Sequence, residues 1–282
     1  MQQRRIVGAT LVALGTGIAA NAVLGPLVLG VIRIRESPAM ETQLLGGELT
    51  SLLLAAPLAI AAGVAWWRGN PLAPFLAAGP SAYALYTYIQ FVLVPDYSRY
   101  AGDNERYFFF YVGLVILGWT TLLAARRAIA LNTPTMTARL GRTMGLSMLV
   151  VGLAFALAWI GSIARLSNPP LPAEYLEHPT AFWLIRLMDL GFVIPVGLAT
   201  GWSLVRGSEW AGRWAYTFIG MQTLLTCAVA GMAIRMAVND DPSVTTPLLV
   251  VSTTGAVLFL ALYIVALRGA AVELRRTRAA SV

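Results

Sequence analysis

Long apolar runs separated by short polar stretches make up most of this chain. Eight runs reach about the 20 residues that a helix needs to cross a bilayer. They are unbroken, whereas the strands of a membrane barrel alternate in polarity over about 10 residues. The pattern predicts an all-α integral membrane protein of about eight transmembrane helices, near residues 6–32, 44–67, 71–94, 108–125, 144–165, 181–205, 211–234 and 246–267.

Composition narrows the chemistry that such a bundle can perform. Of the 282 residues, 58% are hydrophobic and 12% are charged, whereas about a quarter of the residues in soluble domains are charged. The chain has one cysteine, Cys227, one histidine, His178, and no lysine. These counts exclude a redox cysteine pair, a disulfide framework, a Cys/His zinc site and a lysine Schiff base. We therefore expect no metal and no cofactor.

The first apolar run follows a basic N-terminal tip, as the apolar region of a secretory signal also does. The segment MQQRRIVGATLVALGTGIAANA ends in the small-residue triplet Ala-Asn-Ala. Its apolar stretch nevertheless continues to about Ile32, well beyond the usual apolar region of a signal. We therefore interpret this run as an uncleaved first span.

Arginines are distributed unevenly between the two sides that eight spans create. With the N-terminus inside, thirteen arginines fall on the cytoplasmic side and six on the other side. Because positive residues concentrate on the cytoplasmic side, we expect a plasma-membrane protein with both termini in the cytoplasm. No loop concentrates arginines with aromatic residues as a nucleic-acid surface does, so we expect no nucleic-acid partner.

Two stretches of the chain are similar at an offset of 138 residues (195 − 57). PLAIAAGVAWWRGNPLAPFLA, residues 57–77, aligns without a gap on PVGLATGWSLVRGSEWAGRWA, residues 195–215. Each stretch begins with a proline, and an Arg-Gly pair follows that proline eleven residues later. The alignment predicts an internal repeat of two parallel four-helix halves, and two helices alike only in composition are the alternative. The predicted parts are the halves 1–128 and 144–268, a cytoplasmic linker at 129–143 and a cytoplasmic tail at 269–282.

The sixth run, AFWLIRLMDLGFVIP, contains two charged residues, Arg186 and Asp189. Residues three apart share a helix face, and a charge at this depth costs at least about 2.5 kcal/mol. We therefore expect both side chains to face protein or water. The alignment places Arg186 opposite Glu48, which has the opposite charge, so we expect Arg186 to contact Glu48 or Asp189.

Other polar side chains lie at a similar depth, in the outer half of the membrane. They are Asn21, Tyr83, Tyr86, Tyr88, Gln90 and Arg235. With the three charged residues they predict an outward-facing pocket for a ligand or for translocation. The alternative is a static network of ion pairs that fixes the helix register.

Prolines mark two further features of the pattern. Pro57 and Pro195 remove hydrogen bonds in mid-span, and we expect them to break their helices at equivalent places, as helices do at transport sites. The proline-rich stretch SNPPLPAEYLEHPT is predicted to be an outer loop that leaves His178 in solvent.

The stretches YALYTYIQF and DLGFVIP resemble those of a broad group of uncharacterised multi-pass bacterial membrane proteins. That group has a tyrosine-rich third span and an Asp-Leu-Gly segment before a proline. The resemblance covers about half of the chain and implies the multi-pass topology, without an activity.

Two classes of function are consistent with these patterns. One is a permease or channel-like protein that moves a small solute or ion. The other is a non-catalytic subunit or sensor of a membrane complex, in which the polar cluster is structural or binds a lipid or small ligand. An enzyme ranks third because the chain has no Asp-rich diphosphate motif, histidine cluster or Gly-x-Ser-x-Gly motif. A partner protein or a second copy of the chain is compatible with either class.

Overall fold

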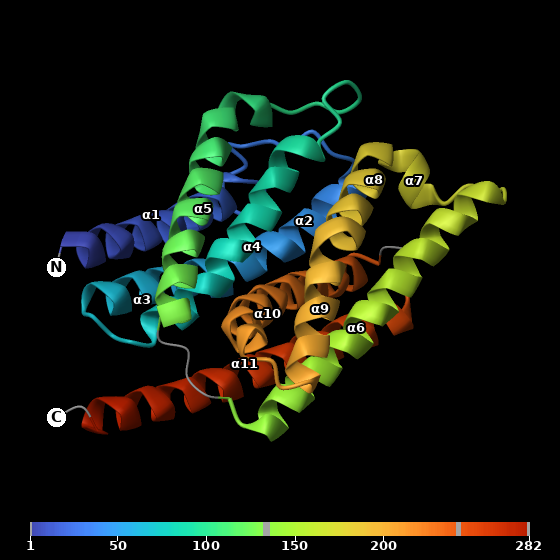
Figure 1. The fold of residues 1–282 in the computed structure, drawn as a ribbon. Helices are drawn as coiled ribbons and strands as arrows, with labels where there is room; N and C mark the ends of the chain where they lie inside the picture. Colours follow the sequence, from blue (N-terminus) through green and yellow to red (C-terminus); the bar gives the residue numbers. More distant parts are fainter. Residues whose placement is uncertain (1, 132–135, 241–243, 281–282) are drawn as a thin grey trace.

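A computed structural model describes residues 2–131, 136–240 and 244–280, and it is helical almost throughout (Figure 1). Parts of the predicted linker and tail, residues 132–135 and 281–282, lie outside the described residues. The α-helices are α1 (Gln2–Leu24), α2 (Pro38–Thr50), α3 (Ala56–Trp67), α4 (Ala73–Leu93), α5 (Phe108–Leu131), α6 (Ala138–Ala164), α7 (Ala173–Glu177), α8 (Pro179–Met188), α9 (Ile194–Val205), α10 (Glu209–Val238) and α11 (Thr246–Ala280). The short turns of helix are η1 (Ser51–Ala55), η2 (Asn104–Tyr107), η3 (Arg165–Ser167) and η4 (Asp189–Val193).

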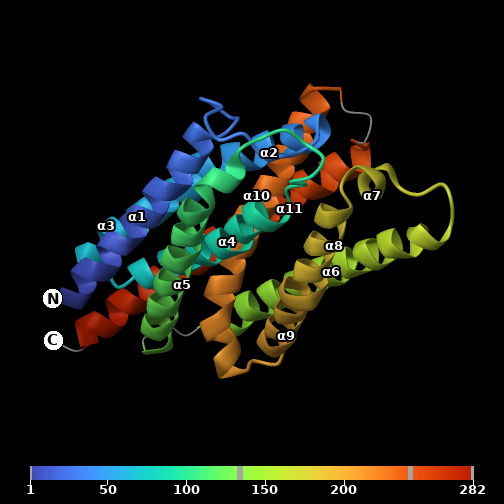
Figure 2. The same cartoon turned by 90° about the horizontal axis from the view of Figure 1, so that it is seen from above.

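The helices form an up-and-down bundle that fits a multi-pass membrane protein. Seven helical segments of the described residues are long and apolar enough to cross a membrane. The remaining long helix, α4, has 21 residues but carries three tyrosines, a glutamine and two prolines, which lower its hydropathy. The start of α1 and the end of α11 lie at the same end of the bundle (Figures 1 and 2). We call the opposite end, which carries the segments 25–37, 94–107 and 168–178, the loop end.

Two helix ends differ from the hydropathy pattern. α1 stops at Leu24 rather than near residue 32, because Gly25 and Pro26 follow and the chain turns there. α11 continues through most of the predicted tail, as far as Ala280.

The segments α2–η1–α3 and α8–η4–α9 are each one continuous helix with a π turn in the middle. The Ala56 N–H bonds to the Ser51 carbonyl, and the Ile194 N–H bonds to the Asp189 carbonyl, five residues back in each case. Pro57 and Pro195 come two residues after these turns, near the start of α3 and α9. Each α-helix is thus interrupted by a π turn just before its proline, and neither proline ends its span.

Glycines bring α1 against α3 and α6 against α9. A Cβ on Gly63 would lie 2.7 Å from the Gly8 carbonyl oxygen, and one on Gly201 would lie 2.8 Å from that of Gly145. Such close backbone contact is the usual way in which membrane helices pack, since lipid supplies no hydrophobic force between them. Each of these two pairs is among the most extensive in the bundle.

α2 packs closely against the rest of the bundle, whereas α8 does not, and the candidate site lies beside α8. α2 packs tightly along α10, where Gly46 meets Gly231 backbone to backbone. α8, in contrast, has little contact with α4, and α6 and α8–α9 stand to one side of the bundle (Figure 2). A cavity lies between these elements.

Candidate functional site

The cavity has a volume of about 1060 Å³ and lies between α2, α4, α6, α8, η4 and α10. Its walls are mostly apolar, as is usual for ligand pockets. At the loop end it is lined by residues such as Pro38 and Glu177, and it extends into the bundle as far as Phe218 and Phe259. The apolar lining includes Met40, Leu44, Phe91, Met148, Val151, Phe155, Trp159, Ile185, Val193, Phe218, Val229, Met232 and Phe259.

Glu48 and Asp189 line this cavity deep within their helices. Glu48 is 2% exposed, and Asn21 Nδ2 donates a hydrogen bond of 2.9 Å to its Oε2. Asp189 accepts from the Tyr86 hydroxyl at 2.7 Å and from Trp159 Nε1 at 2.8 Å. Within the described residues, neither carboxyl group has an ion-pair partner.

Arg186 is buried, as expected, but its partner differs from the one expected. Its Nη2 lies 2.9 Å from Glu174 Oε2, and it bonds to neither Glu48 nor Asp189. Its Nε donates to the Ser162 hydroxyl at 3.0 Å and its Nη1 to a main-chain carbonyl of α8. The guanidinium also stacks on the rings of two aromatic neighbours, Phe182 and Trp159. The expected contact with Glu48 or Asp189 was therefore wrong.

The remaining predicted pocket residues divide into three groups. Tyr83, Tyr86 and Gln90 line the cavity. Asn21 reaches it only through Glu48, and Tyr88 is buried in the apolar cluster behind it. Arg235 is exposed on the outside of α10 and takes no part in the cavity. Its inclusion was wrong because depth along a helix does not show which face a residue occupies.

Carboxyl groups are concentrated in the cavity lining to an extent that the sequence did not reveal. Among the described residues, six acids and no arginine line it. The six are Glu36, Glu48, Glu174, Glu177, Asp189 and Asp240. Four of them come from segments that hydropathy places outside the spans, so they could be assigned to the cavity only from the folded structure.

Several polar atoms in the cavity wall have no hydrogen-bond partner among the described residues. They are Gln90 Nε2, Gln222 Oε1 and Glu36 Oε1, and all three are buried. Buried polar groups are satisfied in most proteins, so a set of unsatisfied ones around one cavity calls for water or a ligand.

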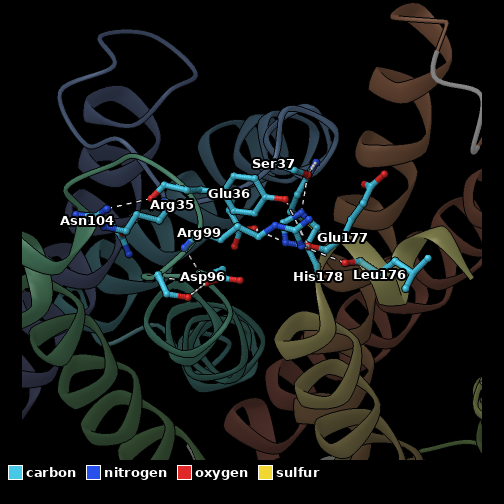
Figure 3. A network of polar contacts seen from close by, with 12 residues as sticks. Arg35, Glu36, Ser37, Asp96, Arg99, Asn104, Leu176, Glu177 and His178 are labelled. Carbon is cyan, nitrogen blue, oxygen red and sulfur yellow. Dashed lines mark hydrogen bonds and ion pairs between the residues drawn. The ribbon is translucent and has the colours of Figure 1, made fainter.

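Polar contacts at the loop end join the two halves of the chain (Figure 3). We call the residues that make them the polar seam: Glu36, Ser37, Arg99, Leu176, Glu177 and His178. Arg99 Nη1 donates to the carbonyl oxygens of Leu176 and Glu177, at 3.1 and 3.2 Å. His178 bonds through Nε2 to the Ser37 hydroxyl, and its Nδ1 lies 3.1 Å from a Glu36 carboxyl oxygen. His178 is only 4% exposed. The expectation that it lies in solvent was wrong, because Glu36 and Ser37 contact its ring nitrogens and the Tyr100 ring stacks on it.

Burial shifts the protonation of two seam residues in opposite directions. The pKa of Glu36 is raised from 4.5 to about 7, first by burial and second by the negative charge of Asp96. Burial lowers the pKa of His178, while Glu177 and Asp96 raise it and Arg99 lowers it. At about pH 7, Glu36 is thus about half protonated and faces a largely neutral His178.

We expect Glu36→Gln to stabilise the protein at pH 8 and to change little at pH 5. A raised pKa contributes stability below about pH 4.5 that is lost as the pH rises through about 7. Glutamine stays neutral and avoids that loss, which is at most roughly 3 kcal/mol at about 1.4 kcal/mol per pKa unit. Thermal melting in detergent from pH 5 to 8 measures the difference. Glu41→Gln, an exposed change on the same side of the bundle, is the control, and a pH-independent difference would contradict the expectation.

Comparison with known proteins gives no further identification. No protein family, no curated protein and no solved structure matches the chain.

Proposed function

We propose that the chain is a permease or channel-like protein that passes a small solute through this cavity. The observation that carries the proposal is the cavity itself, because it leads from the loop end to carboxyl groups within the spans. Intramembrane ionisable groups that face a cavity are characteristic of solute and ion pathways. The proposal includes α4 as an eighth span, a plasma-membrane location, cytoplasmic termini and a loop end that faces outward.

We also propose that the two halves are an internal repeat. The π turns begin at Ser51 and Asp189, which are 138 residues apart (189 − 51). The turns after α3 and α9 each contain a glycine of positive φ, Gly69 at +72° and Gly207 at +73°. The pairs α1–α3 and α6–α9 correspond, and so do α4–α5 and α10–α11. Paired irregular helices in two halves are a frequent feature of transporters.

A second candidate function is a sensor or subunit of a membrane complex. It is favoured by Arg186, whose guanidinium is fully occupied within the protein by Glu174, Ser162 and main chain. A static network of this kind fixes helices and moves no solute.

Flux measurements distinguish the two functions. In a Cys227→Ser background, we expect purified protein in liposomes to pass small organic solutes, and Val229→Cys to lose this flux after reaction with a bulky maleimide. Val229 lines the cavity, so the adduct fills the path. Leu171→Cys places the same adduct on an exposed loop residue outside the lining and is expected to keep the flux. Solute binding without flux in the unmodified protein would instead support a sensor.

A further inference from the structure

The cavity has the opposite charge to the chain that surrounds it. The chain carries a net charge of +7, with 20 basic and 13 acidic residues. The cavity lining nevertheless contains six carboxyl groups and no arginine of the described residues. The potential inside this apolar space is therefore negative wherever those groups are ionised, and low-dielectric walls concentrate such a field.

Internal pairing removes only part of this charge. Glu174 is neutralised by Arg186, at 2.9 Å. Glu48 and Asp189, the two deepest carboxyl groups, accept hydrogen bonds only from uncharged donors of the described part of the chain. A carboxylate at this depth needs a proton or a positive counter-charge. Both carboxyl groups face the cavity, so a cation bound there can supply that charge.

The shape of the lining selects the kind of cation. A bare metal ion needs several converging oxygen ligands, and the described residues contain no group of three or more His, Cys, Asp and Glu that could hold one. The cavity is instead wide, at about 1060 Å³. Its walls are aliphatic and aromatic side chains, the aromatic ones including Phe155, Trp159 and Phe218. These walls match an apolar body, and aromatic faces also attract organic cations.

Unsatisfied polar atoms occur in the same lining. Within the part of the chain that the structure describes, the amides of Gln90 and Gln222 each have a buried atom without a partner, and Glu36, 8% exposed, has a carboxyl oxygen without one. These groups can hydrogen-bond a polar substituent of the ligand or the water around it. A cavity that combines unpaired acids, unsatisfied amides and apolar walls is suited to an amphipathic molecule.

On the basis of the proposed function, we infer that the cavity takes an organic cation with an apolar body, whose positive charge lies beside Glu48 and Asp189. The carboxylates supply the charge complementarity, and the apolar walls remove the body of the molecule from water. An anion of the same shape is excluded by repulsion from the same two groups.

The test is equilibrium binding to the full chain in lipid nanodiscs, with empty nanodiscs as the background. Three probes of similar shape are compared: tetraphenylphosphonium, a cation; triphenylphosphine oxide, neutral; and tetraphenylborate, an anion. We expect the cation to bind at least tenfold more tightly than the anion. We also expect Glu48→Gln with Asp189→Asn to weaken cation binding at least tenfold and to leave the binding of the neutral probe within about twofold.

Matched variants separate the cavity from surface charge and from misfolding. Glu41→Gln removes an exposed acid from the same helix as Glu48, and we expect it to leave binding of all three probes unchanged. Retained binding of the neutral probe shows that the double variant is folded. Equal affinity for cation and anion, or cation binding that survives the double substitution, would overturn the inference while leaving the flux result to decide the proposed function. Absence of binding by all three probes would overturn it as well.

Discussion

Replacing Gly46 by alanine is expected to lower the stability of the protein strongly, although the change adds only one methyl group. The new Cβ would lie 2.3 Å from the Gly231 carbonyl oxygen and 2.6 Å from the Met232 Cα. These are backbone atoms of α10, which cannot rotate away as a side chain can. α2 and α10 must therefore separate along their contact, and such overpacking costs about 1–3 kcal/mol or more. The melting temperature in detergent measures the effect.

Two other glycines give a graded control for this prediction. A Cβ at Gly47 would meet the terminal methyl of Met232 at 2.8 Å, a flexible group that can move. A Cβ at Gly113 would meet nothing within 4 Å, and alanine is the better helix former by about 1 kcal/mol. We expect Gly47→Ala to lower the melting temperature less than Gly46→Ala, and Gly113→Ala to leave it unchanged or to raise it. A Gly46→Ala protein as stable as Gly113→Ala would show that the helices are not in backbone contact.

Loss of the Arg186 side chain is expected to have the second large effect. Its guanidinium makes hydrogen bonds to Ser162, Phe182 and Glu174 and stacks on two aromatic rings. Arg186→Leu removes all of these contacts and takes the charged donor away from the buried Ser162 hydroxyl, and the loss of a hydrogen bond to a charged group costs about 1.5–3 kcal/mol. Arg186→Lys keeps the charge but loses the planar group that stacks on the aromatic rings and donates several hydrogen bonds. We therefore expect its melting temperature to lie between those of the unsubstituted protein and Arg186→Leu. The melting temperatures of the unsubstituted protein and of the two variants test this order.

Double substitutions identify the partner of Arg186. Glu174 is about half exposed at its side chain, 54%, so Glu174→Gln alone is expected to cost at most about 1 kcal/mol. Combined with Arg186→Leu, it should add little further loss, because the pair is already broken. Glu48 makes no hydrogen bond or ion pair with Arg186, so the effect of Glu48→Gln should add to that of Arg186→Leu within about 0.5 kcal/mol. Strong coupling between Glu48 and Arg186 would contradict the structure.

Hydropathy located the long helices because burial in lipid requires long apolar stretches, whatever the packing inside the bundle. It overran the end of α1, where Gly25 and Pro26 end the helix although the residues that follow are still apolar. It also grouped α4 with the other helices, although α4 is the more polar because it faces protein on most sides. Apolar length thus shows that a segment is helical and approximately where it ends.

The partner of Arg186 could not be obtained from spacing along the helix. An arginine side chain is long and extends toward the nearer membrane surface, where α7 brings Glu174 to it. Glu174 lies in a proline-rich stretch whose fold is set by contacts with the segments 35–37 and 94–100. The acidic cavity was hidden for the same reason, since its members come from helices and loops far apart in the chain.

The π turn lets one membrane-spanning helix pack against two different neighbours. Each π turn contains one more residue than an α-helical turn, and one residue corresponds to a rotation of about 100° around the helix axis. α2 before the turn faces α10, whereas α3 after it faces α1. The extra residue thus rotates the second half of the span about the helix axis, so that its two halves present different faces to the bundle. Deleting one residue from Ser51–Ala55 would restore an uninterrupted α-helix. It would also turn Glu48 away from Asn21, its only hydrogen-bonding neighbour among the described residues.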